Sequence, residues 1–339
     1  MNAAFVISIL LVLGVVFVNG WTDAPNAIGS AVATKVFRPR TAIMVAVVFN
    51  FLGVLLMTSI TSQVADTISN MVDFGPDPGK DALIVLTAAM FSIVAWAVAA
   101  WFFGIPTSES HALIAGITGA ALALGGVSAV NRTEWSKVVI GLLESSVLGF
   151  VGGFGLARLI ETFFRRVNRQ KAESFFSKGQ AGAAAGMAFL HGAQDGQKFM
   201  GVFMVALFLN GMAERGLDGT FQIPLWVMIL CSLTMGIGTM VGGWRIIKTV
   251  GMDMVKMHTY QGFASDIAAG ACLLLASLTG LPVSTTHTKT TAIMGVGTSR
   301  RASSVNWGIA LDMIYAWVLT FPGCGLIGFL MAKLFLAIF

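Results

Sequence analysis

Two short polar segments in otherwise apolar sequence carry groups suited to holding a cation. Residues 19–26 (Asn-Gly-Trp-Thr-Asp-Ala-Pro-Asn) and 191–196 (His-Gly-Ala-Gln-Asp-Gly) each place one carboxylate, Asp23 or Asp195, among side-chain amides. A carboxylate in apolar surroundings is costly unless a cation or hydrogen-bond donors compensate its charge. Hard cations such as Na⁺ take oxygen ligands, which carboxylates and amides supply. The segments therefore predict a cation site, and the alternative is a kinked helix with a capping Asp.

Lys198 makes the two segments unequal, because it aligns with Asn26 of the first one. We hypothesise that its ammonium pairs with Asp195 and replaces a metal ion as the countercharge, which favours proton coupling. The predicted cation-binding or coupling residues are Asp23, Asn26, Gln194, Asp195 and Lys198, with any bound Na⁺ at Asp23, Asn26 and Asp195.

Two further segments have the composition of helix starts. Residues 106–111 (Pro-Thr-Ser-Glu-Ser-His) and 282–287 (Pro-Val-Ser-Thr-Thr-His) combine Pro with hydroxyl residues. Pro is favoured in the first helical turn and Ser or Thr at the cap. The free N–H groups and positive dipole of a helix start attract anions, so two facing starts suit a tetrahedral oxyanion. The predicted anion contacts are Thr107, Ser108, Ser110, Ser284, Thr285 and Thr286.

Ionisable residues nearby are supporting candidates. His111 and His287 close the two hydroxyl segments, and they would donate to the anion, carry a proton or hold the hairpin by hydrogen bonds. No Cys cluster accompanies them, so a zinc site is not expected. Ionisable residues inside a membrane are candidates for function, although any of them can simply pair with a polar neighbour. The further candidates are Glu109, Glu144, Asp266, Asp312 and Lys289.

The composition identifies the elements that must position these residues as membrane helices. The chain has 339 residues, of which 56% are hydrophobic and 11% charged, and its mean hydropathy is +0.83. Soluble domains carry about 25% charged residues, which excludes a water-soluble enzyme, and the apolar content excludes disorder. At about 20 residues per span, the length fits about ten spans. The net charge of +5 is expected in cytoplasmic loops, not in a nucleic-acid site.

Apolar windows and basic loops give a topology. Spans are predicted near 3–36, 40–62, 82–104, 105–130, 135–160, 180–213, 222–244, 261–280, 281–299 and 306–338. Between them lie four basic clusters, within 35–40, 158–178, 245–256 and 300–301. Since basic loops face the cytoplasm, the N- and C-termini are expected outside, in the cell (inner) membrane.

The order of the segments predicts an internal repeat. An acidic segment and then a hydroxyl segment occur in each half of the chain, and an odd number of spans, about five per half, gives the halves opposite orientations. We expect an all-α polytopic membrane protein with two inverted-topology repeats, 1–160 and 179–339, joined by a basic cytoplasmic connector at 161–178. The long spans 1–36 and 180–213 are each expected to break at the acidic segment, and the hydroxyl segments to form re-entrant hairpins.

At these residues the sequence resembles the inorganic phosphate transporter (PiT) family. The resemblance rests on Gly-x-x-Asp-x-x-Asn-x-x-Gly at 20–29, on His-Gly-Ala-Gln-Asp-Gly-Gln-Lys at 191–198 and on the two hydroxyl segments, and it covers nearly the whole chain. It implies an inverted-repeat symporter for phosphate, often dimeric, driven by Na⁺ or H⁺. By motif match, Asp23, Asn26 and Asp195 are cation- or substrate-site residues, and Ser108, Ser110, Ser284, Thr285 and Thr286 are phosphate contacts.

The sequence departs from the family pattern at two positions. Gln194 stands where the family usually has Asn, and Lys198 where many members have Asn. Lys at this position resembles the bacterial branch, in which proton coupling and transport of metal–phosphate complexes occur. The resemblance therefore leaves Na⁺ and H⁺ open as coupling ions, and phosphate alone or a metal–phosphate complex open as cargo.

The favoured function is import of inorganic phosphate by alternating access, with no cofactor, no enzymatic activity, no nucleic acid, and membrane lipids and a second copy as partners. The alternative within the family is a sulfate permease. Phosphate keeps a proton to donate at neutral pH, so a carboxylate such as Asp23 accepts from it and repels sulfate. A lipid-phosphate phosphatase using Ser108 or Ser284 is disfavoured, because no Arg lies near either motif to stabilise charge. A passive channel is a third class of function. It would need no coupling ion, so accumulation against a gradient separates it from a symporter.

Overall fold

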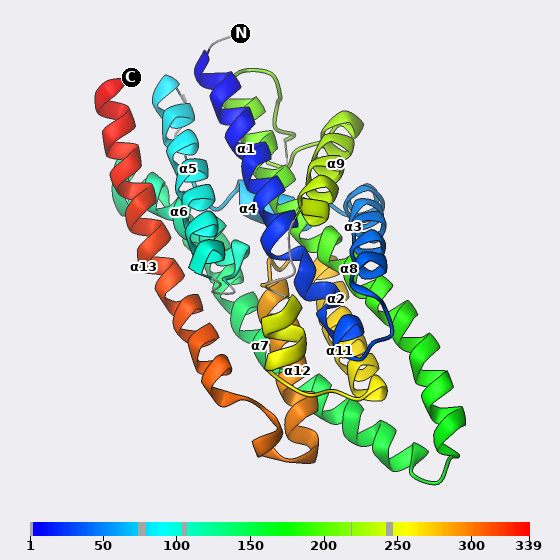
Figure 1. The fold of residues 1–339 in the computed structure, drawn as a ribbon. Coiled ribbons are helices and arrows are strands. Elements are labelled where there is room, and N and C mark those ends of the chain that lie inside the picture. The colour runs from blue at the N-terminus through cyan, green and yellow to red at the C-terminus, as the bar shows by residue number, and fades with distance from the viewer. Residues whose placement is uncertain (1–2, 74–78, 104–106, 218, 242–246) are drawn as a thin grey trace.

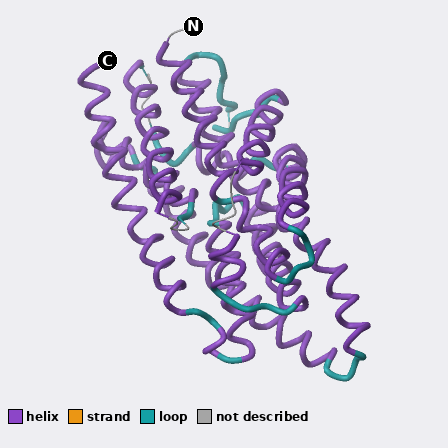
Figure 2. Tube along the Cα trace, in the orientation of Figure 1, coloured by secondary structure: helices purple, strands orange, loops and turns teal. Residues whose placement is uncertain are grey.

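The chain folds into a bundle of helices aligned along one long axis (Figure 1). The computed structural model describes residues 3–73, 79–103, 107–217, 219–241 and 247–339. Within these ranges every assigned element is a helix, and the connections between them are mostly short (Figure 2). Pro106 of the first hydroxyl segment and the start of the basic cluster 245–256, residues 245 and 246, lie outside the described residues.

The helices match the expected spans closely. The first half contains α1 (Ala3–Thr22), α2 (Ala24–Ala33), α3 (Pro39–Ile60), α4 (Gln63–Ser69), α5 (Lys80–Phe103), α6 (Glu109–Gly125), the 3₁₀ turn η1 (Gly126–Ala129) and α7 (Arg132–Phe164). The second half contains α8 (Arg169–Leu209), α9 (Leu225–Val241), the π-helix η2 (Ile247–Asp253), α11 (Thr259–Thr279), α12 (Thr285–Arg300), the 3₁₀ turn η3 (Ala302–Ser304) and α13 (Trp307–Ile338). The connector expected over 161–178 is largely helical, because only 165–168 separate α7 from α8.

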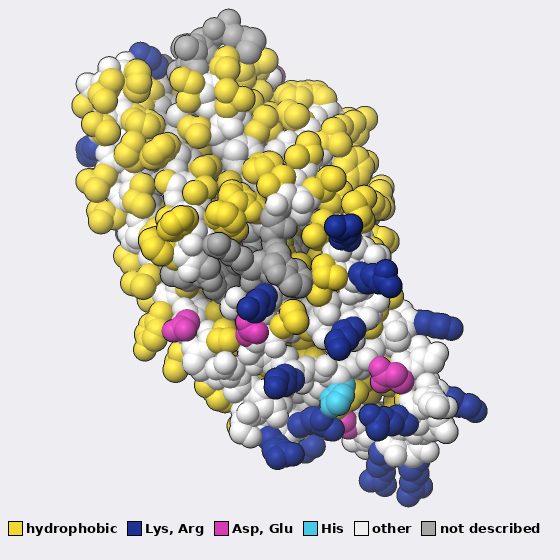
Figure 3. Space-filling view, in the orientation of Figure 1, with side chains coloured by type: hydrophobic (Ala, Val, Ile, Leu, Met, Phe, Trp, Pro, Cys, Tyr) yellow, Lys and Arg dark blue, Asp and Glu magenta, His cyan; other side chains and the backbone are white. Residues whose placement is uncertain are grey.

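Seven helical stretches of the described chain are long and apolar enough to cross a membrane. They are Phe5–Ala33, Pro39–Ile60, Lys80–Phe103, Glu109–Ala129, Arg132–Phe164, Thr259–Thr279 and Trp307–Ile338. The expected ten spans also include α8, α9 and α12, of which α9 is a shorter apolar helix while α8 and α12 carry many buried polar residues. Hydrophobic side chains cover most of the surface above the basic end in Figure 3. The fold is that of an all-α polytopic membrane protein.

The charged residues divide the molecule into two ends. Both chain termini lie at one end, and the α7–α8 turn and the α12–α13 connection lie at the other (Figure 1). Lys and Arg side chains gather at this second end, which we call the basic end (Figure 3). The first half therefore runs from the terminal end to the basic end, and the second half runs back.

The two halves share local features. Ser108 caps α6 and Ser284 caps α12, and each side chain accepts from the backbone N–H three residues on. Asn131 caps α7 and Asn306 caps α13 in the same way. Each Asn also donates its own N–H to a distant carbonyl, Asn131 to Met71 and Asn306 to Met254, both at 2.9 Å. The same types of cap therefore occur in the same order in the two halves.

The predicted helix break is present in the first half. α1 ends at Thr22 and α2 begins at Ala24, with Asp23 between them. Pro25 lacks an N–H and its ring clashes with the carbonyl four residues earlier, so a continuous helix is disfavoured here. The break places Asp23 and the start of α2 in the buried interior.

The prediction of a helix break at 191–196 is wrong, because α8 is continuous from Arg169 to Leu209. The segment contains Gly but no Pro, so every backbone N–H remains able to donate. Gly192 serves close packing instead. A Cβ there would lie 2.3 Å from the carbonyl oxygen of Asn50 in α3. The length of the expected span 180–213 did not require a break, since α8 extends beyond the bundle at the basic end (Figure 1).

Gly53 of α3 packs on the backbone of α8, and its replacement should destabilise the fold. A Cβ at Gly53 would lie 1.9 Å from the carbonyl oxygen of Phe189. We expect Gly53→Ala to lower the thermal unfolding temperature of the purified protein, at a cost of about 1–3 kcal/mol, because two packed backbones must separate. Gly155→Ala in α7 is the control, since open space surrounds that position and Ala favours a helix. Equal unfolding temperatures for the two variants would contradict this packing.

Candidate functional site

Two helix starts meet in the interior of the bundle. α6 begins after Ser108 and α12 after Ser284, and both serines are fully buried. Their Oγ atoms lie 2.8 Å apart, so the tips of the α5–α6 and α11–α12 hairpins are in direct contact. The first turn of a helix leaves N–H groups without intrahelical partners and carries positive partial charge. Two such ends side by side form a region that favours an anion.

Asp23 lies beside these starts and is bound by hydroxyl and amide donors. The Thr286 hydroxyl donates to its Oδ1, and Asn26 Nδ2 donates to the same atom at 2.8 Å. Asn26 Nδ2 also lies 3.0 Å from the Thr286 hydroxyl oxygen. The predicted cation-site residues Asp23 and Asn26 and the predicted anion contact Thr286 therefore form one cluster.

Asp195 occupies the same region from the opposite half. Its Oδ1 accepts from Lys198 Nζ at 2.7 Å, which confirms the hypothesised ion pair, and both side chains are fully buried. Its Oδ2 accepts from Asn19 Nδ2 at 2.9 Å and from the Thr285 hydroxyl at 3.2 Å. Lys198 Nζ also donates to Ser110 Oγ at 2.8 Å. One ammonium thus joins the acidic segment of one half to the hydroxyl segment of the other.

His191 completes the acidic cluster. Ligand atoms of Asp23, His191 and Asp195 all lie within 4.8 Å of one another, a spacing that a single metal ion can bridge. His191 Nε2 lies 3.4 Å from Asp195 Oδ2, and its Nδ1 lies 3.2 Å from Asn50 Oδ1. His191 and Asn19 lie in the two acidic segments of the sequence, but neither was predicted as a site residue. The available signal was that His191 precedes Asp195 by one helical turn, which puts both on one face.

Several buried oxygens around the cluster have no hydrogen-bond partner among the described residues. They are Asp23 Oδ2, Asn19 Oδ1, Asn26 Oδ1, Gln194 Oε1 and Glu109 Oε2. Buried acceptors without donors are costly, and a cation or a proton satisfies them. Gln194 is otherwise held by its Nε2, which donates to the Leu281 carbonyl at 3.2 Å.

The supporting residues lie around the helix starts. Glu109 is buried, and its Oε1 accepts from the Thr22 hydroxyl at 3.0 Å, next to the α1–α2 break. The His111 and His287 rings contact each other at a centroid distance of 4.2 Å. His287 also packs on Trp317, with ring centroids 3.6 Å apart. These contacts place the histidines where they hold the two hairpins together.

The remaining candidates do not join this cluster. Thr107 is half-buried, and Glu144 and Asp312 are exposed on the outer faces of α7 and α13. Asp266 and Lys289 are buried and form an ion pair with each other, and Ser30 donates to Asp266 Oδ1 at 2.7 Å. Lys289 therefore neither snorkels nor reaches the hydroxyl tips. Its pair ties α11 and α12 to α2 one turn away from Asn26.

The Lys289–Asp266 pair should behave as a compensated buried charge. Removing one partner leaves an uncompensated charge, at a cost of about 3–5 kcal/mol, whereas replacing both with apolar residues is often nearly neutral. We expect Lys289→Met to lower the thermal unfolding temperature strongly and Lys289→Met/Asp266→Leu to recover most of the loss. If the double variant is less stable than the single one, the two charges do not compensate each other.

Comparison with known proteins identifies a family of similar sequences. The family model described as the phosphate transporter family matches residues 19–171 and 164–328. A probable low-affinity inorganic phosphate transporter of Bacillus subtilis (strain 168) is 37% identical over 325 residues, which cover 95% of each chain. A protein of the same description from Rhizobium meliloti (strain 1021) is 38% identical over 311 residues, 92% of this chain and 90% of its own.

A solved structure agrees in fold. The structure described as the sodium-dependent phosphate transporter matches with a TM-score of 0.91 over 100% of both chains. The two sequences are 21% identical, so this likeness shows the shared fold alone.

Proposed function

The chain belongs to the phosphate transporter family, and from this premise we propose that it is a secondary active symporter that imports inorganic phosphate with a cation. The curated relatives are named as transporters, and the chain is not an enzyme. The observation that carries the proposal is the meeting of two serine-capped helix starts beside an acidic cluster that is only partly compensated.

The helix starts supply the anion site. Hydroxyls of Ser108, Ser110, Ser284, Thr285 and Thr286 lie at or within one turn of the two helix starts. A tetrahedral oxyanion offers acceptors in several directions, so donors from two opposed helix ends can bind it together. In the described structure Thr285 and Thr286 donate to the carboxylates of Asp195 and Asp23. When phosphate binds, these two hydroxyls would donate to phosphate oxygens in place of the carboxylates. This change of partner would couple the anion site to the acidic cluster.

The charge balance requires a cation. Among the described residues, four carboxylates are buried, Asp23, Glu109, Asp195 and Asp266, and two ammonium groups, Lys198 and Lys289. The ammonium groups pair with Asp195 and Asp266, so among the described residues Asp23 and Glu109 have no ammonium partner. Unpaired buried charges are strongly disfavoured, and bound phosphate adds more negative charge. Protons or metal cations must therefore enter with the substrate.

Protons are the favoured coupling ion. The ammonium of Lys198 already supplies the charge that a metal ion would bring to Asp195. The remaining carboxylates, Asp23 and Glu109, each bind hydroxyl or amide donors through one oxygen and leave the other free to take a proton. Na⁺ is the alternative, since a related fold belongs to a transporter named as sodium-dependent. A further alternative is that the cargo is a metal–phosphate complex, with its metal ion bound by Asp23, His191 and Asp195.

The basic end supports a proposed orientation of the protein in the membrane. We propose two inverted repeats, since the equivalent caps and hairpins occur in order while the halves run in opposite directions. Basic loops face the cytoplasm, so the basic end is the cytoplasmic one and the termini lie outside. Rocking of the two halves around the shared site then exposes it alternately to each side.

Uptake by the purified protein tests the function. Radiolabelled phosphate uptake into proteoliposomes is measured with a proton gradient, a Na⁺ gradient or neither, and with excess sulfate. We expect accumulation above the external concentration with a proton gradient and little inhibition by sulfate. Accumulation only with a Na⁺ gradient would identify Na⁺, and not the proton, as the coupling ion. Simple equilibration under every gradient would show a channel, and full inhibition by sulfate would favour the sulfate permease.

Ser284→Ala tests the anion contact. Losing one hydrogen bond to a charged ligand costs about 1.5–3 kcal/mol, so we expect KM for phosphate to rise about tenfold or more. Because the variant also loses a helix cap, Asn131→Ala is the matched control, since it uncaps α7 away from the site. A similar rise in KM for both variants would assign the effect to capping and not to phosphate.

A further inference from the structure

The basic end contains a cavity that the transport function does not use. It has a volume of about 1000 Å³ and is bounded by the end of α7, the start of α8, the start of α11 and the end of α12. Its lining includes five arginines, Arg158, Arg165, Arg169, Arg300 and Arg301. These come from segments far apart in the sequence, so the fold and not a local run of charge brings them to one cavity.

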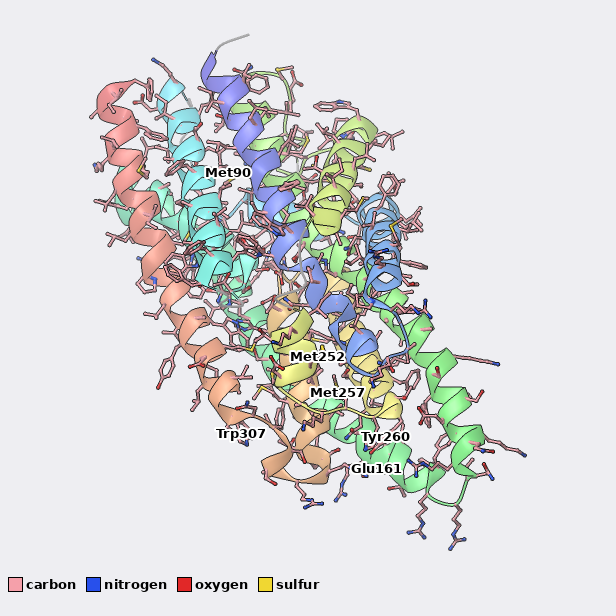
Figure 4. The ribbon with its side chains drawn as sticks, in the orientation of Figure 1. Met90, Glu161, Met252, Met257, Tyr260 and Trp307 are labelled. Atoms are coloured by element: carbon pink, nitrogen blue, oxygen red, sulfur yellow. The ribbon has the colours of Figure 1, made fainter. Side chains whose placement is uncertain are left out.

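The acidic residues of this cavity are already engaged. Glu161 accepts from the Tyr260 hydroxyl at 2.8 Å and lies near two guanidinium groups, Arg300 at 3.6 Å and Arg158 at 3.9 Å. Figure 4 shows Glu161 and Tyr260 close together at this end of the molecule. Glu173 accepts from the Thr259 hydroxyl at 2.5 Å.

Three guanidinium groups remain uncompensated. Among the described residues, Arg165, Arg169 and Arg301 have no carboxylate within ion-pair distance. All three side chains are exposed, so water and salt screen their repulsion, and together they give the cavity a positive potential that attracts anions. Arginine is suited to this role, because its planar guanidinium donates two parallel hydrogen bonds to a phosphate group.

Aromatic residues form one wall of the cavity. Phe164 and Phe176 both line it, and their rings contact each other at a centroid distance of 4.8 Å. Phe176 in turn contacts the Tyr260 ring at 6.2 Å, and Tyr260 holds Glu161. Contacts between aromatic side chains and a hydrogen bond to Glu161 therefore hold the lining of the cavity together. Basic residues that only orient a chain in a membrane do not require such contacts.

We propose that this cavity is a second anion site, which binds the phosphate groups of a multiply charged phosphorylated molecule. The ligand chemistry fits both the headgroup of an anionic phospholipid and a free oligophosphate, since each brings phosphate oxygens to three guanidinium groups. α12 carries Ser284 of the transport site at its start and Arg300 of the cavity at its end. Occupancy of the cavity thus holds the far end of a helix that contacts the substrate.

Tripolyphosphate binding to the full-length protein tests the free-anion source. The protein is placed in phosphatidylcholine nanodiscs with saturating inorganic phosphate, so that the transport site is filled, and binding is measured by calorimetry. We expect Arg169→Gln/Arg301→Gln to weaken binding about tenfold or more, since each arginine supplies charge-assisted hydrogen bonds. The matched control is Arg166→Gln/Lys171→Gln, which removes the same charge from the same region without touching the cavity lining. This control should change affinity by less than about twofold.

Nanodiscs with cardiolipin, whose headgroup carries two phosphate groups, test the lipid source. Here the thermal unfolding temperature is compared with that in phosphatidylcholine for the same two double variants. A stabilisation lost only in Arg169→Gln/Arg301→Gln assigns the cavity to a lipid headgroup, and selective loss of tripolyphosphate binding assigns it to a free oligophosphate. Equal effects of both double variants, or no dependence on the cavity pair in either arm, would overturn the proposal. Both variants change exposed side chains, so both are expected to fold.

Discussion

Asp23→Asn is expected to abolish cation-coupled phosphate uptake while leaving the protein folded in the membrane. Asn keeps the shape of the side chain and can still accept at its oxygen from Asn26 and Thr286. It removes a negative charge that no buried ammonium of the described residues compensates. Binding of the coupling cation at this position therefore loses its main electrostatic attraction. Removing one partner of a buried charge interaction costs about 3–5 kcal/mol, so uptake should fall by about 100-fold or more.

The matched control for this prediction is Asp312→Asn. Asp312 also lies in a membrane helix, but it is exposed on the outer face of α13 and contacts no residue of the acidic cluster. Uptake by Asp312→Asn proteoliposomes should remain within about twofold of wild type, as for most exposed substitutions. If Asp23→Asn also stays near the wild-type rate, the unpaired carboxylate is not the coupling group.

Lys198→Asn is expected to change the ion that drives uptake. The ammonium of Lys198 compensates Asp195 and donates to Ser110, so its removal leaves a buried carboxylate without countercharge. An uncompensated buried charge costs about 3–5 kcal/mol, which a bound Na⁺ can offset. The new amide also resembles Asn26 beside Asp23 in the first half. Proton-driven uptake should therefore fall about tenfold or more, and a Na⁺ gradient should now drive it.

Two substitutions control this change in ion dependence. Lys171→Asn removes a lysine from the exposed start of the same helix, α8, and should keep wild-type ion dependence. Lys198→Ala removes the charge without adding an oxygen ligand, so it should lose proton-driven uptake and gain less Na⁺-driven uptake. Unchanged ion dependence in Lys198→Asn would show that the Lys198–Asp195 pair is structural.

Local chemistry made the helix starts and the first break predictable. Pro25 interrupts backbone hydrogen bonding wherever it stands inside a helix, and Ser108 and Ser284 cap helices through their own side chains. The Lys198–Asp195 pair was also accessible, because residues one turn apart on a helix face the same side. These features depend on neighbours in the sequence.

Features that depend on distant contacts could not be predicted in the same way. The close packing of α8 on α3 is one example, because no local signal shows that Gly192 lies against the backbone of Asn50. In the sequence, Asn50 is a single amide in an apolar span. Only the fold shows that its Oδ1 lies 3.2 Å from His191 Nδ1. Lys289 has an obvious need for a partner, but only the packing of α11 against α12 identifies Asp266.

Anomalous X-ray scattering from arsenate tests the central claim most directly, because arsenate has the shape and charge of phosphate and its position can be located without ambiguity. Crystals of the full-length protein are soaked with arsenate at neutral pH. The two opposed helix starts predict an arsenic peak within about 4 Å of both Ser108 Oγ and Ser284 Oγ, a distance set by one hydrogen bond to an oxyanion oxygen. A peak confined to the arginine-lined cavity of the basic end, with none between the two serines, would contradict the account.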